Sequence, residues 1–187
     1  MSVGFYLAED GVLEPQSPLE WFNQPMRVLE PKEGWGRVEG FSAKEAWGDA
    51  GKMQSGLVML LAEWRRYLRA VENPSARIHV YQGWSPGTGH ATDSHHYRDP
   101  CPAADVGIEG VDLLTAYLAA ERFPFGGIGL YPHWKPHPGL HLDLYGKGQG
   151  DTTETLTPGA RWYRNRAGRY GSITPQLIAA MVRGEVP

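Results

Sequence analysis

The chain has 187 residues, of which 41% are hydrophobic, so it is long enough to bury one hydrophobic core. Its formal net charge of −3 at pH 7 argues against nucleic acid or an anionic membrane surface as the main partner. The single cysteine, Cys101, excludes an internal disulfide framework, and the longest apolar run, residues 56–62, is too short to span a bilayer. The first residues show neither the basic nor the apolar region of a secretory signal, so we expect synthesis in the cytoplasm without a signal peptide.

The first 42 residues show no sustained hydrophobic period. Prolines recur between positions 15 and 31 and interrupt any long helix, while Trp21 and Phe22 are suited to pin the segment onto a core. We therefore expect residues 1–42 to form a wrapped N-terminal extension and residues 43–187 to form a single domain.

An amphipathic helix is predicted from about Ala43, and its pattern is strongest from Leu57 onward. Apolar residues recur at i, i+3, i+4 and i+7 from Leu57 to Val71, and charged residues occupy the other side. Asn73-Pro74 ends the pattern, because a residue that precedes proline disfavours helical backbone.

Short strands and helices then follow one another without regular alternation, which favours an α+β fold over a doubly wound sheet. A second helix is predicted at 111–122, and Thr174 followed by Pro175 is typical of the start of a last helix. Alternating or compact apolar patterns predict strands in four segments: 77–82, 103–108, 127–131 and 139–145.

Reactive side chains are concentrated in one part of the chain, since six of the seven histidines lie between positions 90 and 141. His96, Asp105 and His141 supply two imidazoles and one carboxylate, the set that a catalytic zinc takes when its fourth position stays open for water. Residues two apart in a strand point to the same face, so His141 and Asp143 share a face. Ser94 and His96 share a side in the same way if that piece is extended. Burying such polar pairs without a partner or metal would be costly, so the combination favours a metal site.

Each histidine also has an ordinary explanation. His79, His90 and His133 fit solvated positions, and His95 beside His96 fits a surface pair. The metal hypothesis is favoured by the combination of residues rather than by any one of them.

The segments SHHYRDPCPAADV, GGIGLYP and LHLDLY resemble the zinc peptidoglycan peptidases of the D-Ala-D-Ala carboxypeptidase type. These peptidases share a fold with the hedgehog signalling domain, so the resemblance implies a small antiparallel sheet that carries the metal site and packs against helices. GWSPG also resembles the family's turn Gly-Tyr-Arg-Ser-Pro, and the likeness extends over roughly residues 78–163. The residues that match Ser-x-His, Gly-x-Ala-x-Asp and His-x-Asp are Ser94, His96, Ala103, Asp105, His141 and Asp143, and Ala160-Arg161-Trp162 resembles a closing Arg-Trp.

The chain departs from the family pattern in three places. The spacing between His96 and Asp105 is two residues longer than usual, which leaves open whether His95 or His96 is the ligand, although Ser-x-His favours His96. The arginine of the turn is missing from residues 83–86, and Pro138 stands where many members carry an acidic general base.

The general base therefore has two candidates. Asp143 lies on the predicted ligand strand, and His137 lies in the loop before it. Asp143 could instead orient a ligating imidazole as a carboxylate behind the metal ligands.

The resemblance implies Zn²⁺ as cofactor and a stem or bridge peptide of bacterial peptidoglycan as substrate. Candidate substrate-binding residues are Arg98, Ser94 and Trp84. A carboxypeptidase must neutralise a terminal carboxylate, for which arginine is best suited, so the missing arginine favours an endopeptidase over a D,D-carboxypeptidase unless Arg98 replaces it.

We expect a monomer that acts at the cell wall as a phage or prophage lysis enzyme, released through a holin or carried in a virion. The first alternative is a non-catalytic wall-binding or phage structural protein that retains the fold. A zinc amidohydrolase that acts on another small amide is the second.

Overall fold

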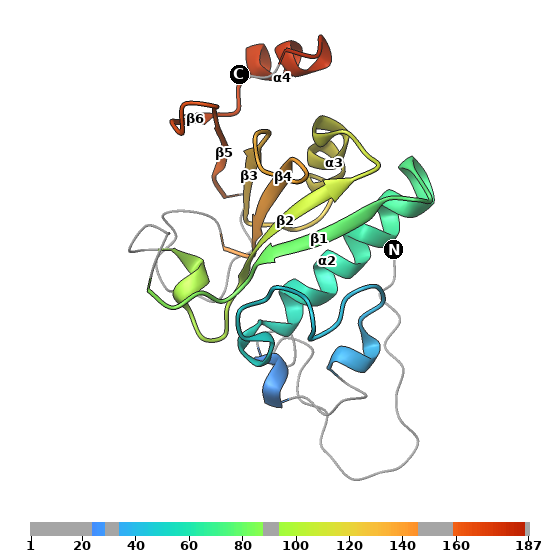
Figure 1. The fold of residues 1–187 in the computed structure, drawn as a ribbon, viewed down its shortest axis with the longest axis vertical. Helices are drawn as coiled ribbons and strands as arrows, with labels where there is room; N and C mark the ends of the chain where they lie inside the picture. The colour runs from blue at the N-terminus through green and yellow to red at the C-terminus, as the bar shows by residue number, and fades with distance from the viewer. Residues whose placement is uncertain (1–23, 29–33, 88–93, 146–158, 186–187) are drawn as a thin grey trace.

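The computed structural model describes residues 24–28, 34–87, 94–145 and 159–185 of the chain. Within them the protein has an α+β fold with three α-helices and a six-stranded mixed sheet (Figure 1). None of the helices in the described ranges has the length and apolar character needed to cross a membrane. The strands are β1 (Arg77–Gln82), β2 (Ala103–Glu109), β3 (Gly127–Tyr131), β4 (Gly139–Asp143), β5 (Arg161–Arg164) and β6 (Tyr170–Ser172).

The sheet has the strand order β1-β2-β4-β3-β5-β6. All neighbouring strands are antiparallel except β3 and β5, which are parallel. The four predicted strands are confirmed as β1 to β4, which are antiparallel as expected, but the parallel pairing of β3 with β5 makes the whole sheet mixed rather than antiparallel. Strand β3 is antiparallel to β4 on one side and parallel to β5 on its other side. The sheet is therefore mixed.

One face of the sheet forms the core. Val106 and Ile108 of β2 alternate with residues of the opposite face, as do Leu140 and Leu142 of β4, and all four are buried. Helices α2 (Ser55–Tyr67) and α3 (Leu113–Ala120) lie on this face (Figure 1). Each fully buried Leu or Ile contributes about 1.5–3 kcal/mol relative to exposure, so this face holds the fold together. The other face remains available for polar side chains.

Helix α2 begins later than the predicted start at Ala43. Residues 43–54 form turns and a 3-10 helix, η3 (Ala50–Lys52), instead. Gly48 has φ +77°, and a Cβ there would lie 1.9 Å from the carbonyl oxygen of Trp84. This left-handed residue, packed against a neighbouring turn, is incompatible with a continuous helix.

The C-terminal end of the same helix also differs from expectation. After Tyr67 the chain continues through a π-helical turn, η4 (Leu68–Glu72), which changes the period of the side chains. Leu68 stays in the core, but Val71, predicted to be buried with it, is 59% exposed. The apolar stripe therefore ends one turn earlier than the sequence suggested.

The two ends of the described chain are attached to this core differently. Met26 is buried, and its N–H donates to the Met53 carbonyl over 2.8 Å, so this part of the predicted extension contacts the domain. Trp21 and Phe22 lie outside the described residues. At the other end, the Thr174 hydroxyl accepts a hydrogen bond from the Leu177 N–H, which confirms the predicted start of α4 (Pro175–Val182).

Candidate metal centre

The polar face of the sheet brings two predicted ligands together. Asp105 of β2 pairs directly with His141 of β4 in the antiparallel register, so the two side chains stand side by side on one face. His141 and Asp143 also share this face, as predicted, and their side chains are in contact. Leu140 and Leu142 point the other way into the core and anchor the ligand strand.

The third ligand comes from a short turn rather than from a strand. His96 lies in the 3-10 helix η5 (His95–Tyr97), so the extended backbone on which a shared side of Ser94 and His96 depended does not form. Ser94 instead caps this turn, and its hydroxyl accepts a hydrogen bond from the His96 N–H over 3.3 Å. The turn buries His96 almost completely, at 1% exposure.

Three ligand atoms converge, one from each residue. His96 Nε2 lies 3.2 Å from His141 Nδ1 and 3.4 Å from Asp105 Oδ1, and His141 Nδ1 lies 2.8 Å from Asp105 Oδ1. Ligands at the usual bond lengths of a tetrahedral zinc ion stand about 3.3 Å apart. The buried group of His96, Asp105 and His141 could therefore hold a metal ion with only small movements.

Both histidines are oriented through their second ring nitrogen. His96 Nδ1 donates to the Gly83 carbonyl over 2.5 Å, so its Nε2 is directed at the other two ligand atoms. His141 Nε2 donates to Asp143 Oδ2 over 3.0 Å, which directs Nδ1 the same way. Such a second hydrogen bond fixes the tautomer and raises the basicity of a metal-binding imidazole.

Asp143 is held by several groups at once and is 1% exposed. Its Oδ1 accepts hydrogen bonds from the N–H groups of Gly127, at 3.0 Å, and Tyr145, at 2.9 Å. His95 Nδ1 lies 3.5 Å from the same oxygen, so His95 contacts Asp143 rather than joining the ligand group. His95 and His96 are both buried, which excludes the alternative of a surface pair. This arrangement favours the orienting role for Asp143 over the role of base.

Electrostatics at the site favour a cation. Burial alone would raise the pKa of Asp105, but hydrogen bonds from His141 and His96 outweigh it and lower the pKa. Burial alone would lower the pKa of His141, but hydrogen bonds to Asp105 and Asp143 raise it to about 9. Two ionised carboxylates thus flank the His141 imidazole, and a divalent ion can replace the Nδ1 proton between His141 and Asp105.

Aromatic side chains extend from the ligand group along the sheet. The Trp162 ring covers Gly129, its centroid lies 5.2 Å from that of His141, and its Nε1 donates to the Tyr131 hydroxyl over 3.2 Å. Tyr131 stacks on Trp134 with ring centroids 4.0 Å apart. A surface hollow opens here, lined by Tyr131, His133, Trp134, Arg164, Asn165, Arg166 and Gly168.

Trp162 and Arg164 were not predicted as site residues. The closing Arg-Trp of the resemblance was the available signal for Trp162. The position of Arg164 depends on β5 pairing beside β3, where Leu130 is opposite Tyr163, so that Tyr131 and Arg164 follow on the same face. A pairing of strands so distant in sequence is not visible in the local pattern.

The structure does not gather all the predicted site residues at the ligand group. Trp84 lies in the turn after β1, with Lys52 Nζ 3.7 Å from the centre of its ring. Arg98 caps the end of η5 and is half-buried. His137 belongs to a separate group with His79 and Glu109, in which His79 is partly exposed and pairs with Glu109. His90 lies outside the described residues.

Thiol chemistry is excluded as an alternative at this site. Cys101 is buried, and burial raises the pKa of its thiol to about 12. Its Sγ donates to the Ala103 carbonyl over 3.3 Å. The thiol is therefore protonated at neutral pH and serves packing rather than nucleophilic attack.

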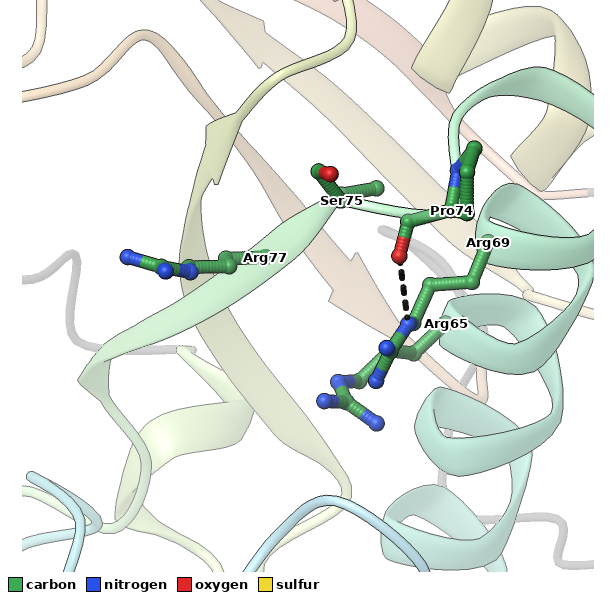
Figure 2. A pocket seen from close by; sticks show the side chains of 6 residues that line it. Arg65, Arg69, Pro74, Ser75 and Arg77 are labelled. Carbon is green, nitrogen blue, oxygen red and sulfur yellow. Dashed lines mark hydrogen bonds between the residues drawn. The ribbon is translucent and has the colours of Figure 1, made fainter.

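A second hollow lies between η4, α2 and β1 and has the opposite character. Its side chains include the guanidinium groups of Arg65, Arg69 and Arg77, and Arg69 donates to the Pro74 carbonyl over 3.1 Å (Figure 2). Burial and the neighbouring Arg69 charge lower the pKa of Arg65. A cluster of cationic side chains repels a metal ion, so this hollow is not a rival for the metal centre.

Comparison with known proteins adds no family assignment, since no protein-family model, curated protein or solved structure matches the chain. The functional argument therefore depends on the geometry of the ligand group and on the chemistry of its surroundings.

Proposed function

We propose that the protein is a zinc-dependent peptidase that hydrolyses an amide bond in bacterial peptidoglycan. The observation that carries this proposal is the convergence of His96, Asp105 and His141, with each imidazole oriented by an acceptor on its other nitrogen. An ion pair or a solvated histidine pair needs no such orientation. The resemblance to peptidoglycan peptidases supplies the substrate, and a phage or prophage lysis enzyme is the proposed setting.

Zinc is the ion that suits the ligand group best. Two imidazole nitrogens and one carboxylate oxygen form a mixed set that a borderline ion prefers over Mg²⁺ or Ca²⁺, which favour oxygen ligands. Three protein ligands leave one coordination position for the reaction, as in catalytic rather than structural zinc sites. When bound, zinc would lower the pKa of a water molecule and polarise the scissile carbonyl.

The residues behind the ligands would position the site rather than react. Asp143 accepts hydrogen bonds on both oxygens and would keep the His141 ring in place throughout the reaction. His137, the other candidate base, is grouped with His79 and Glu109. Replacing Asp143 and His137 separately distinguishes these roles, because a base affects turnover while a positioning residue also affects zinc affinity at the group of His96, Asp105 and His141.

The hollow beside the ligand group suits a peptide with acidic groups. Tyr131 and Trp134 offer flat apolar surfaces, while Arg164 and Arg166 offer guanidinium groups that pair well with carboxylates. Stem peptides of peptidoglycan carry such carboxylates. The turn before η5 has no arginine at residues 83–86, and the Gly83 carbonyl there is used by His96, so we propose an endopeptidase rather than a carboxypeptidase.

A non-catalytic wall-binding or phage structural protein is the second candidate. It is favoured by Pro138, which stands where the resemblance places an acidic base. The Pro138 carbonyl accepts a hydrogen bond from the Ile108 N–H over 2.9 Å, so this position serves the sheet. A protein of this kind would bind sacculi without releasing fragments.

Digestion of purified sacculi separates the two candidates. The peptidase should release muropeptides whose mass identifies the bond that is cut, and a chelator should stop the release. His141→Ala should be inactive, while Val71→Ser, a change at an exposed position of η4 outside both the ligand group and the hollow, should keep its activity. Binding of sacculi with no released fragments would overturn the peptidase proposal, and free D-alanine as main product would overturn the endopeptidase assignment.

A further inference from the structure

A second group of potential ligands lies on the same face of the sheet. It consists of His79 from β1, Glu109 from β2 and His137 from the connection between β3 and β4. One ligand atom from each residue lies within 4.8 Å of the others. His79 Nε2 is 2.9 Å from Glu109 Oε2, and the His79 and His137 rings stack 4.8 Å apart at an interplanar angle of 12°.

The backbone holds this group in place. The Tyr81 hydroxyl donates to the His137 carbonyl over 3.0 Å and accepts from the His137 N–H over 2.9 Å. Ile108 binds the next carbonyl, that of Pro138, and continues the sheet to this point. The one ligand that comes from a loop is thus attached to the two strands that carry the other ligands. A ligand that is already positioned loses little freedom when an ion binds.

We propose that His79, Glu109 and His137 form a second, more open divalent-metal site. Two imidazoles and one carboxylate suit Zn²⁺ as in the first group, and the half-exposed side chains leave room for water as a further ligand. Ligand atoms around zinc stand about 3.3 Å apart, so rotation of side chains at the surface brings the three donors to the required distances.

This site is separate from the first and is not the second half of a two-metal centre. Asp105 and Glu109 are four residues apart on β2, which corresponds to about 13 Å along a strand. Gly107 lies between them, and the Tyr81 ring covers it so closely that a Cβ there would be 2.2 Å from the ring. Two ions that act together stand about 3.5–4 Å apart.

An ordinary surface ion pair accounts for less of the arrangement. Arg77 Nη1 lies 3.8 Å from Glu109 Oε2 and the arginine side chain is 70% exposed, so this contact is weak. A His79–Glu109 pair alone gives no reason for His137 to stack on His79 with its backbone clamped by Tyr81. A shared ion provides a reason for this stacking. It would also fix the position of the β3–β4 connection, which includes Trp134 of the hollow beside the first site.

Metal counting on the full chain tests the proposal independently of activity. The protein is equilibrated by dialysis against Zn²⁺ at micromolar concentration, and bound zinc per chain is measured by elemental mass spectrometry. The double variant His79→Ala/His137→Ala should bind one equivalent fewer than the wild type, whereas His133→Ala should bind as many as the wild type. His96→Ala/His141→Ala should retain one equivalent, which would be lost on adding Glu109→Gln.

Thermal unfolding gives a second measurement for the variant without the first group. Zn²⁺ should raise the Tm of His96→Ala/His141→Ala, and the rise should vanish when His137→Ala is added. A second equivalent that survives in His79→Ala/His137→Ala would overturn the proposal, as would equal zinc content in that variant and the wild type. If only the first site were wrong, the wild type would still bind zinc. That zinc would be lost only in variants of His79, Glu109 or His137, and not in variants of His96 or His141.

Discussion

A carboxylate that accepts a hydrogen bond from a metal-binding imidazole can either orient that imidazole or act as a general base. The contacts of Asp143 distinguish these two roles. Both of its oxygens accept hydrogen bonds, from the Gly127 and Tyr145 N–H groups and from His141 Nε2. Burial would raise its pKa, but the bonds from His141 and His95 lower it, so it stays ionised and accepts these bonds. A proton taken by Asp143 would have to disrupt this network.

Asp143→Asn tests the distinction. The amide can place an N–H where an acceptor for His141 is needed, so zinc affinity should fall by about 10–100-fold along with activity. Competition with a chromophoric chelator measures the affinity. If Asp143 is instead the base, turnover should fall by about 10²–10⁴-fold while zinc affinity stays at the wild-type value. His137→Ala is the parallel variant for the other candidate base.

Ser94 lies one step further from the candidate metal position, at the start of the turn that carries His96. Ser94→Ala removes the cap of η5 and should weaken zinc binding by up to about fivefold, the equivalent of about 1 kcal/mol for a lost N-cap. Ser94→Thr keeps the hydroxyl and should bind zinc normally. A raised KM in Ser94→Ala with unchanged zinc affinity would contradict this role and indicate a contact with substrate instead.

At the scale of elements, the π-helical turn η4 makes a clear prediction about the core. Leu68→Ala should lower the free energy of unfolding by about 2–5 kcal/mol, because the side chain is fully buried. Val71→Ser should change it by less than about 0.5 kcal/mol, because Val71 is 59% exposed. Denaturant unfolding measures both. A cost for Val71→Ser similar to that for Leu68→Ala would mean that the helix keeps its regular period and buries Val71.

The elements also show why some of the fold is predictable from the sequence. The strands β1 to β4 were predicted because one buried face gives alternation or a compact apolar run, which is local information. The start of α2 was not, since the turn at Gly48 is set by contact with Trp84, far along the chain. Strands β5 and β6 are short and depend on pairing with β3 and with each other. Local pattern carries no signal for such pairing.

In the candidate site, too, the features set by local sequence pattern were predictable, and those set by contacts between distant segments were not. The shared face of His141 and Asp143 was predictable from the period of a strand, and Asp105 needed only the β2–β4 register to join them. The orientation of His96 was not predictable, because it depends on the Gly83 carbonyl and on a 3-10 turn. The grouping of His79 with Glu109 and His137 also depends on how distant segments pack.

At the scale of the whole molecule, the candidate metal centre and the hydrophobic core occupy opposite faces of one sheet. Removal of metal should therefore leave the fold intact but less stable. An ion at one hundred times its Kd adds about 2.7 kcal/mol, so chelation should lower the Tm by several degrees while far-ultraviolet circular dichroism stays unchanged. Loss of secondary structure on chelation at room temperature would show that the core depends on the ion.

The central claim is that His96, Asp105 and His141 hold a zinc ion that drives amide hydrolysis in peptidoglycan. The most direct test removes all metal from the purified protein, returns Zn²⁺ in steps, and follows the release of muropeptides from sacculi together with bound zinc. Activity should be absent without metal and should rise with the equivalent of zinc that His96→Ala and His141→Ala fail to bind. Full activity in the metal-free protein, or in either of these variants, would contradict the account.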